Sequence, residues 1–157
     1  MSWTRPAAMH LTLHFFGDIE SARLPELIAA LTHATASHGS MTLNARGVGH
    51  FGNRVIWAGL HGEVEQLQSL AVGIRSAATQ CGYAVEKREF NPHVTLGRAR
   101  TPARGMGMKL VRWRDAQLGS FTASEIELVR SELSPQGSRY TVLEKFPLTS
   151  PAQSAGC

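Results

Sequence analysis

The tetrapeptide His-x-Thr-Leu occurs twice in this chain, first at His10–Leu13 and again at His93–Leu96. With seven histidines and eleven threonines in 157 residues, chance gives roughly 0.5 His-x-Thr pairs, and the following leucine lowers this number about tenfold. Both copies stand in short runs that alternate polar and apolar residues, which is the pattern of a half-buried strand. Successive side chains of a strand point to opposite faces, so each histidine shares a face with its threonine. The fold therefore has to supply two similar strands, each with a polar face backed by apolar residues.

Strand and helix patterns alternate along the rest of the chain and predict a single domain over residues 1–148. The strand, helix, strand order recurs, which indicates an internal duplication. The polar residues 149–157 are expected to form a disordered tail. The expected elements are strands at 9–16, 41–51, 54–60 and 93–98, helices at 21–38 and 63–81, a basic loop with a short helix at 101–114, and two antiparallel strands between 121 and 148 around the turn at 134–137.

The composition excludes several classes of protein. No apolar run is long enough to span a bilayer, and the first ten residues lack the apolar core of a signal peptide, so we expect a cytoplasmic protein. The two cysteines, Cys81 and Cys157, have no spacing typical of a zinc site.

Positive charge is concentrated beside the second motif. Between Lys87 and Arg114 there are eight basic residues and one acidic residue, Glu89. Such a run can be an ordinary solvated face. Its position next to a histidine motif favours an anionic ligand such as RNA or a nucleotide phosphate, because guanidinium groups bind phosphate in a bidentate manner.

The paired motifs suggest acid–base chemistry at a phosphate. A histidine with an ordinary pKa of about 6.5 can give or take a proton near neutral pH. Two histidines on opposite sides of a phosphate could activate water and protonate the leaving oxygen, while each threonine hydroxyl holds a non-bridging oxygen. This chemistry needs no metal ion, and we expect no cofactor.

Four stretches carry a resemblance to a known family: "WTRPAAMHLTLHFFGD", "FNPHVTLGRAR", "RVIWAGL" and "ELSPQGSRYTVLEKFPL". They are similar to the two-histidine phosphoesterase superfamily, in particular to its RNA 2′,3′-cyclic phosphodiesterases, also called 2′-5′ RNA ligases. The resemblance implies an α+β fold with two pseudo-symmetric lobes of antiparallel sheets and flanking helices around a central cleft, each lobe supplying one motif. It also implies hydrolysis of a 2′,3′-cyclic phosphate at an RNA end to a 2′-phosphate.

The resemblance also assigns roles to residues of this sequence. It makes His10 the proton donor to the departing 3′ oxygen and His93 the base that activates water, with Thr12 and Thr95 on the phosphate. Arg98 matches a basic position that follows the second motif, but on a regular strand it would face away from His93, so a bulge or a strand end is needed. Further candidate substrate contacts are His14, Arg100 and Trp113, whereas Phe16 and Trp57 are expected in the core.

Other readings stay open at this point. Members of the family usually begin with a further strand and helix ahead of the Trp-x-x-Pro segment, so an unfilled sheet edge could pair with a second molecule, and we expect a monomer or a weak homodimer. The fold could serve as a non-catalytic RNA- or nucleotide-binding module, or ligate 2′-5′ linked RNA as the reverse reaction. A third reading is a metal hydrolase in which His10, His14 and His93 bind zinc.

Overall fold

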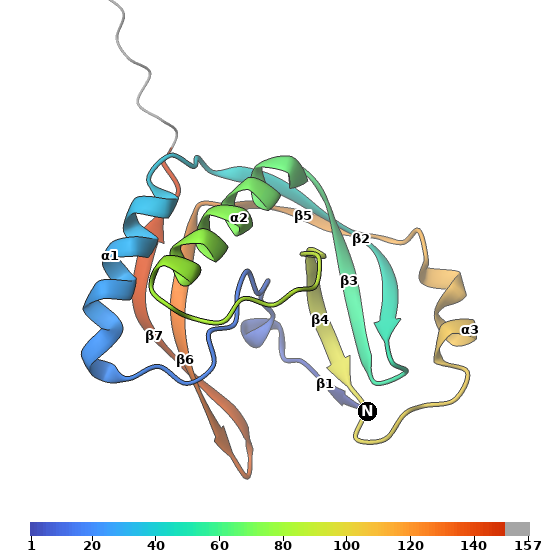
Figure 1. The fold of residues 1–157 in the computed structure, drawn as a ribbon. Helices are drawn as coiled ribbons and strands as arrows, with labels where there is room; N and C mark the ends of the chain where they lie inside the picture. Colours follow the sequence, from blue (N-terminus) through green and yellow to red (C-terminus); the bar gives the residue numbers. More distant parts are fainter. Residues whose placement is uncertain (150–157) are drawn as a thin grey trace, which may run out of the picture. The chain divides into compact units, whose positions relative to one another are not determined.

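The computed structural model describes residues 1–149, which form two compact units. The first unit comprises residues 1–15, 42–65 and 88–121, and the second comprises residues 16–41, 66–87 and the chain from residue 122 onward. Both units combine antiparallel strands with helical segments, so the α+β class is confirmed (Figure 1). No helix within residues 1–149 has the length and apolar character needed to cross a membrane.

A five-stranded sheet dominates the first unit. The order of its strands is β1-β4-β3-β2-β5, and the β1–β4, β4–β3 and β3–β2 pairs are antiparallel. The connection between β2 and β3 is tight because Gly52 and Asn53 both adopt a positive φ. The strands are β1 Ser2–Trp3, β2 Met41–Phe51, β3 Val55–Gly62, β4 His93–Arg98 and β5 Gln117–Ala123.

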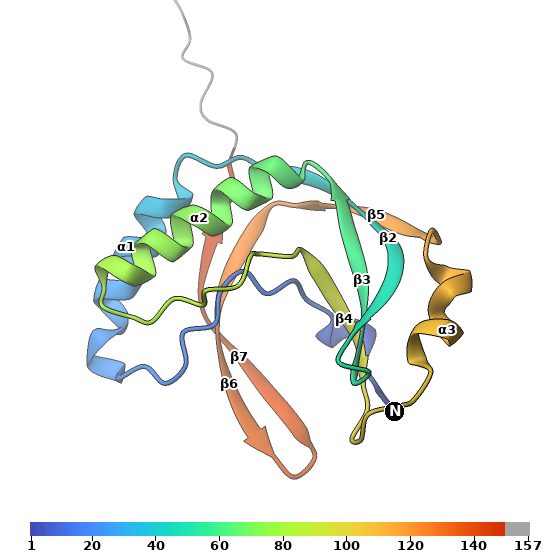
Figure 2. The same cartoon turned by 45° about the vertical axis from the view of Figure 1, so that its right-hand side comes forward.

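One face of this sheet is apolar and buried. On β3, Ile56, Ala58 and Leu60 are all less than 10% exposed and share one face, while the residues between them are half-buried on the other. A short helix, α3 (Met106–Leu110), lies beside β2 and continues into the 3₁₀ turn η3 (Val111–Trp113), as Figure 2 shows. The approach is close at Gly107, where a Cβ atom would lie 2.9 Å from Nε2 of His50.

The second unit contains the helix α1 (Leu24–Thr35), most of the helix α2 (Val64–Gln80) and a hairpin of β6 (Glu125–Ser134) and β7 (Gly137–Pro147). The helix α1 packs against β7, and its residues Leu27 and Leu31 are buried. The turn of the hairpin points away from both helices in Figure 2. It is closed by a hydrogen bond of 2.7 Å from Oγ of Ser134 to the carbonyl oxygen of Gly137.

Most of the predicted elements are confirmed, but one predicted strand is nearly absent and one observed strand was not predicted. The predicted helices correspond to α1, preceded by the 3₁₀ turn η2 (Ser21–Arg23), and to α2, while the second motif forms β4 with the predicted bounds. The predicted strand at 9–16 reduces to one isolated bridge, at Leu11, and the chain bends at Leu13. The strand β5 was not predicted as a separate element. The tail prediction falls on residues 150–157, outside the described residues, except for its first residue, Thr149.

Candidate active site

The two motifs lie side by side in the first unit. Leu11 forms an antiparallel bridge with Val94, in the middle of each motif. In an antiparallel pair the residues that flank a bridge lie opposite one another, so His10 faces Thr95 and Thr12 faces His93. The alternation of side chains places these four residues on the sheet face opposite Leu11 and Val94. We call it the motif face.

Both motifs belong to the same compact unit, which differs from the expectation drawn from the sequence. Residues 1–15 and 88–121 belong to the same compact unit, so both motifs do as well. The sequence led us to expect one motif in each lobe, and the two compact units do not divide the motifs in that way. The physical reason is the direct bridge between Leu11 and Val94, which attaches the first motif to the sheet that contains the second.

Both motif histidines are held in the same way. Nδ1 of His10 lies 2.8 Å from the carbonyl oxygen of Ala8, and Nδ1 of His93 lies 2.7 Å from the carbonyl oxygen of Asn91. The carbonyl in each case belongs to the residue two positions earlier. A carbonyl oxygen can only accept, so each Nδ1 must carry the hydrogen, and in the neutral ring the lone pair is then on Nε2. Two separate segments thus fix the same tautomer and ring orientation.

A β-bulge brings Arg98 to the motif face. The register between β3 and β4 pairs Trp57 with Thr95 but Ile56 with Gly97, so Leu96 is an extra residue on β4. This inserted residue reverses the parity of all positions after it. Arg98 therefore pairs with Val55, two residues before Trp57 on β3, and lies on the same face as Thr95. The bulge that the sequence required for Arg98 is present.

Aromatic rings surround one histidine of the pair. The rings of Phe51 and His93 meet edge to face with centroids 5.0 Å apart, and the Trp57 ring centroid lies 6.3 Å from that of His93. Phe51 and Trp57 contact one another at 5.2 Å. His93 is half-buried beside these rings, whereas His10 is exposed. Trp57 is half-buried on the motif face rather than a full core residue. Phe51 was not singled out from the sequence, although an aromatic residue at the end of a predicted strand was a usable signal.

The other predicted contacts, His14, Arg100 and Trp113, lie outside the strands of the sheet. His14 follows the bend at Leu13 and is half-buried, so the strand alternation does not fix its face. Arg100 follows the end of β4, and Trp113 closes η3 with the Arg112 guanidinium 5.1 Å from its ring centroid. Neither Arg100 nor Trp113 belongs to a strand of the sheet. Among residues 1–149, no three His, Cys, Asp or Glu side chains are close enough together to hold a metal ion, so His10, His14 and His93 do not form the zinc site considered above.

The basic run lies on the same unit as the motifs. All of its members except Lys87 belong to residues 88–121. One further arginine of this unit, Arg46, forms an ion pair of 3.6 Å with Asp115, and both side chains are largely exposed. Exposed pairs of this kind contribute little free energy, so the positive charge remains available to an anion.

Comparisons with known proteins point in one direction. A family model described as the 2′-5′ RNA ligase superfamily matches residues 4–135. The RNA 2′,3′-cyclic phosphodiesterase of Methanothermobacter thermautotrophicus is 30% identical over 154 residues, which cover 94% of this chain and 83% of that protein. The Escherichia coli protein of the same name is 30% identical over 149 residues, covering 92% of this chain and 80% of that protein.

Solved structures have the same fold. TT0787 of Thermus thermophilus matches with a TM-score of 0.78 at 31% identity, over 95% of this chain and 82% of that one. LigT of Escherichia coli in its apo form matches with a TM-score of 0.78 at 26% identity, over 95% of this chain and 81% of that one. LigT is also known in crystal structures with 3′-AMP and with NADP+.

Proposed function

This chain belongs to the 2′-5′ RNA ligase superfamily, and we propose that it hydrolyses a 2′,3′-cyclic phosphate at an RNA end to a 2′-phosphate by two-histidine acid–base catalysis. It is an enzyme of the cyclic phosphodiesterase type, the name carried by several relatives at about 30% identity. The nucleotide complexes of LigT, with 3′-AMP and with NADP+, support a nucleotide or RNA substrate.

The observation that carries the proposal is that the same kind of hydrogen bond holds both motif histidines. Each Nδ1 is bound to the carbonyl oxygen of the residue two positions earlier, so in each neutral ring the lone pair that can accept a proton is on Nε2. A non-catalytic binding module has no need of two imidazole rings that both present Nε2 for proton transfer. A hydrolase does, because one ring must accept a proton while the other donates one.

The reaction then proceeds as an in-line displacement. Nε2 of His93 takes a proton from water, and the water oxygen attacks the phosphorus atom opposite the 3′ oxygen. The bond between phosphorus and the 3′ oxygen breaks, and protonated His10 gives the Nε2 hydrogen to that oxygen. The products are a 2′-phosphate and a free 3′-hydroxyl, and the two rings return to their starting states by proton exchange with solvent. The assignment of base and acid rests on the family resemblance.

The threonines and Arg98 bind the phosphate in this proposal. Thr12 lies opposite His93, and Thr95 lies opposite His10. Their hydroxyl groups can therefore donate to the two non-bridging oxygens. The Arg98 guanidinium, turned to the motif face by the bulge, stabilises the charge that grows on these oxygens in the transition state. The reaction needs no metal ion.

The experiment is a product analysis on a short RNA that ends in a 2′,3′-cyclic phosphate, with excess chelator. We expect conversion to a 2′-phosphate and a rate about 10² to 10⁴ lower in His10→Ala and in His93→Ala, since each variant removes one general acid or base. His33→Ala, an exposed histidine on α1, is the matched control and should keep the wild-type rate. RNA that binds without conversion would instead support a non-catalytic module, and loss of activity with chelator would support a metal hydrolase.

A further inference from the structure

A cavity of about 280 Å³ opens directly beside His93. Gly59, in its lining, is the cross-strand partner of His93 on β3. Asn91, also in the lining, supplies the carbonyl oxygen that holds Nδ1 of His93. Cross-strand neighbours lie about 5 Å apart, so the cavity begins within one nucleotide's reach of the scissile phosphate in the proposed site.

The cavity is walled by backbone segments that glycine residues bring together. A bulge at Arg46 and Gly47 interrupts the pairing of β2 with β3, and Gly47 has a φ of 76°. A Cβ atom on Gly47 would lie 2.5 Å from the carbonyl oxygen of Arg114, and one on Gly59 would lie 3.0 Å from that of Arg46. Larger residues would push these segments apart. Bulges of this kind redirect side chains next to active sites, here that of Arg46.

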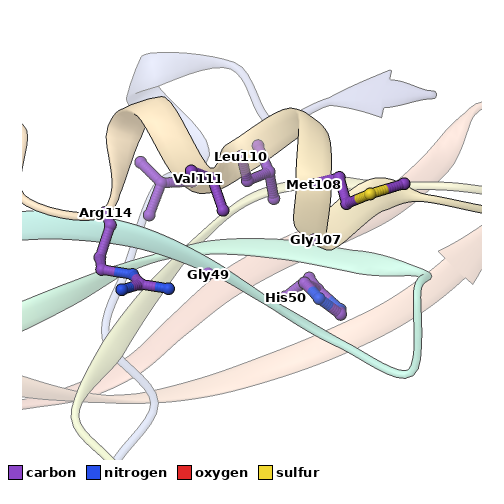
Figure 3. A pocket seen from close by; sticks show the side chains of 8 residues that line it. Gly49, His50, Gly107, Met108, Leu110, Val111 and Arg114 are labelled. Atoms are coloured by element: carbon purple, nitrogen blue, oxygen red, sulfur yellow. The ribbon is translucent and has the colours of Figure 1, made fainter.

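Two arginine residues line this cavity. Arg46 comes from the bulge of β2, and Arg114 follows η3. The Arg46 side chain has a weak, exposed ion pair with Asp115, and within residues 1–149 no carboxylate pairs with Arg114. Arg114 also lines a neighbouring cavity of about 360 Å³, and Figure 3 shows its side chain reaching from the helical segment toward the strand that carries Gly49. Two arginines with so little acidic neutralisation fit an anion that accepts several hydrogen bonds.

We propose that this cavity binds the phosphate on the 5′ side of the terminal nucleotide, the group that links it to the preceding residue of the RNA. This inference rests on the proposed function, because it assumes that the terminal 2′,3′ phosphate lies between His10 and His93. A ribose then separates the two phosphates, one at the histidine pair and one at the arginine pair. The enzyme consequently prefers an oligonucleotide end to a mononucleoside cyclic phosphate.

Equilibrium binding of two product-like ligands tests the inference without turnover. The ligands are adenosine 2′-phosphate and adenosine 2′,5′-bisphosphate, measured by calorimetry at one fixed salt concentration. We expect the wild-type protein to bind the bisphosphate about tenfold more tightly, the gain typical of one charge-assisted hydrogen bond. Arg114→Gln should remove most of this preference, and Arg46→Gln combined with Arg114→Gln should bring the ratio close to one.

Arg139→Gln, an exposed arginine of β7, is the matched control and should keep the wild-type ratio. Because the readout is a ratio for one protein, a general loss of affinity cannot imitate the effect, and Arg46→Gln alone changes only an exposed side chain. If the wild-type protein bound the bisphosphate and the 2′-phosphate equally well, or if the ratio of the two affinities were unchanged in the double variant, the inference would be overturned and the proposed function would stand. A protein that binds neither ligand would overturn both.

Discussion

Gly49 is the position where a single methyl group should disturb the wall of the site. It pairs with Trp57 across β2 and β3, and a Cβ atom there would lie 2.3 Å from Cζ2 and 2.5 Å from Cη2 of the indole ring. Ordinary contact begins at 3.4 Å, so the ring must retreat by 3.4 − 2.3 = 1.1 Å in Gly49→Ala. Forced overpacking costs about 1–3 kcal/mol, and alanine in a strand regains about 0.5–1 kcal/mol. We expect a net loss of up to about 2.5 kcal/mol in the free energy of unfolding.

The same displacement of the Trp57 ring should lower the catalytic rate. The Trp57 ring packs against Phe51 and lies near His93, so its retreat moves the surroundings of the proposed base. Misplacement by about 1 Å can cost on the order of 100-fold in rate. We therefore expect kcat/KM on a cyclic phosphate substrate to fall by up to about that factor.

A double-mutant cycle separates this effect from a general loss of stability. Urea unfolding is followed by circular dichroism for the wild type, Gly49→Ala, Trp57→Leu and the double variant. The cost of the added methyl group should disappear once the indole is gone. Gly73→Ala on α2 is the matched control: its Cβ atom would lie 3.6 Å from its nearest neighbour, the carbonyl oxygen of Ala34 on α1, and it should stabilise the protein by about 0.5–1 kcal/mol. An equal cost of Gly49→Ala with and without Trp57 would show that the added methyl group does not act through the indole ring.

Three further predictions follow from the site and the hairpin. Thr95→Val should lower kcat/KM about 10- to 100-fold through loss of one phosphate hydrogen bond, with Thr95→Ser retaining most activity; a fully active valine variant would remove this contact from the account. Arg98→Gln should cost at least about tenfold more activity than Arg100→Gln, because the bulge turns Arg98 to the motif face, and equal losses would contradict this. The hydrogen bond and charge of Glu125 raise the pKa of Lys145 above 10.5. A lysine whose pKa is raised in the folded state stabilises the fold while it is protonated, and this stabilisation is lost as the pH rises through the raised pKa. Lys145→Gln should therefore lower Tm slightly at about pH 8 and not at about pH 12.

The sequence was most informative where local periodicity decides the structure. The apolar spacing of residues 63–81 predicts α2 to within one residue at each end, and alternation predicts β4 with its observed bounds. In α2 the buried side chains recur at the period of a helix. The pairing of each histidine with its threonine on one face followed from the alternation of side chains along a strand.

Features that depend on pairing between distant segments could not be predicted from the sequence. The alternation of residues 9–16 predicts a strand, but only Leu11 has a partner in the described structure, and the chain then bends. The face of Arg98 depends on a bulge that is defined only by the register of β4 against β3. The arginine pair of Arg46 and Arg114 comes from positions 68 residues apart, 114 − 46, and is brought to one cavity by glycine contacts that no local pattern reports.

The pH dependence of kcat/KM tests the two-histidine mechanism most directly. It is measured on an RNA with a 2′,3′-cyclic phosphate end, in the presence of chelator, for the wild type, His10→Ala and His93→Ala. We expect a bell-shaped profile for the wild type. Without the base His93 the fall in rate on the acid side disappears, and without the acid His10 the fall on the alkaline side disappears. A bell-shaped profile that survives unchanged in either variant would contradict the two-histidine mechanism.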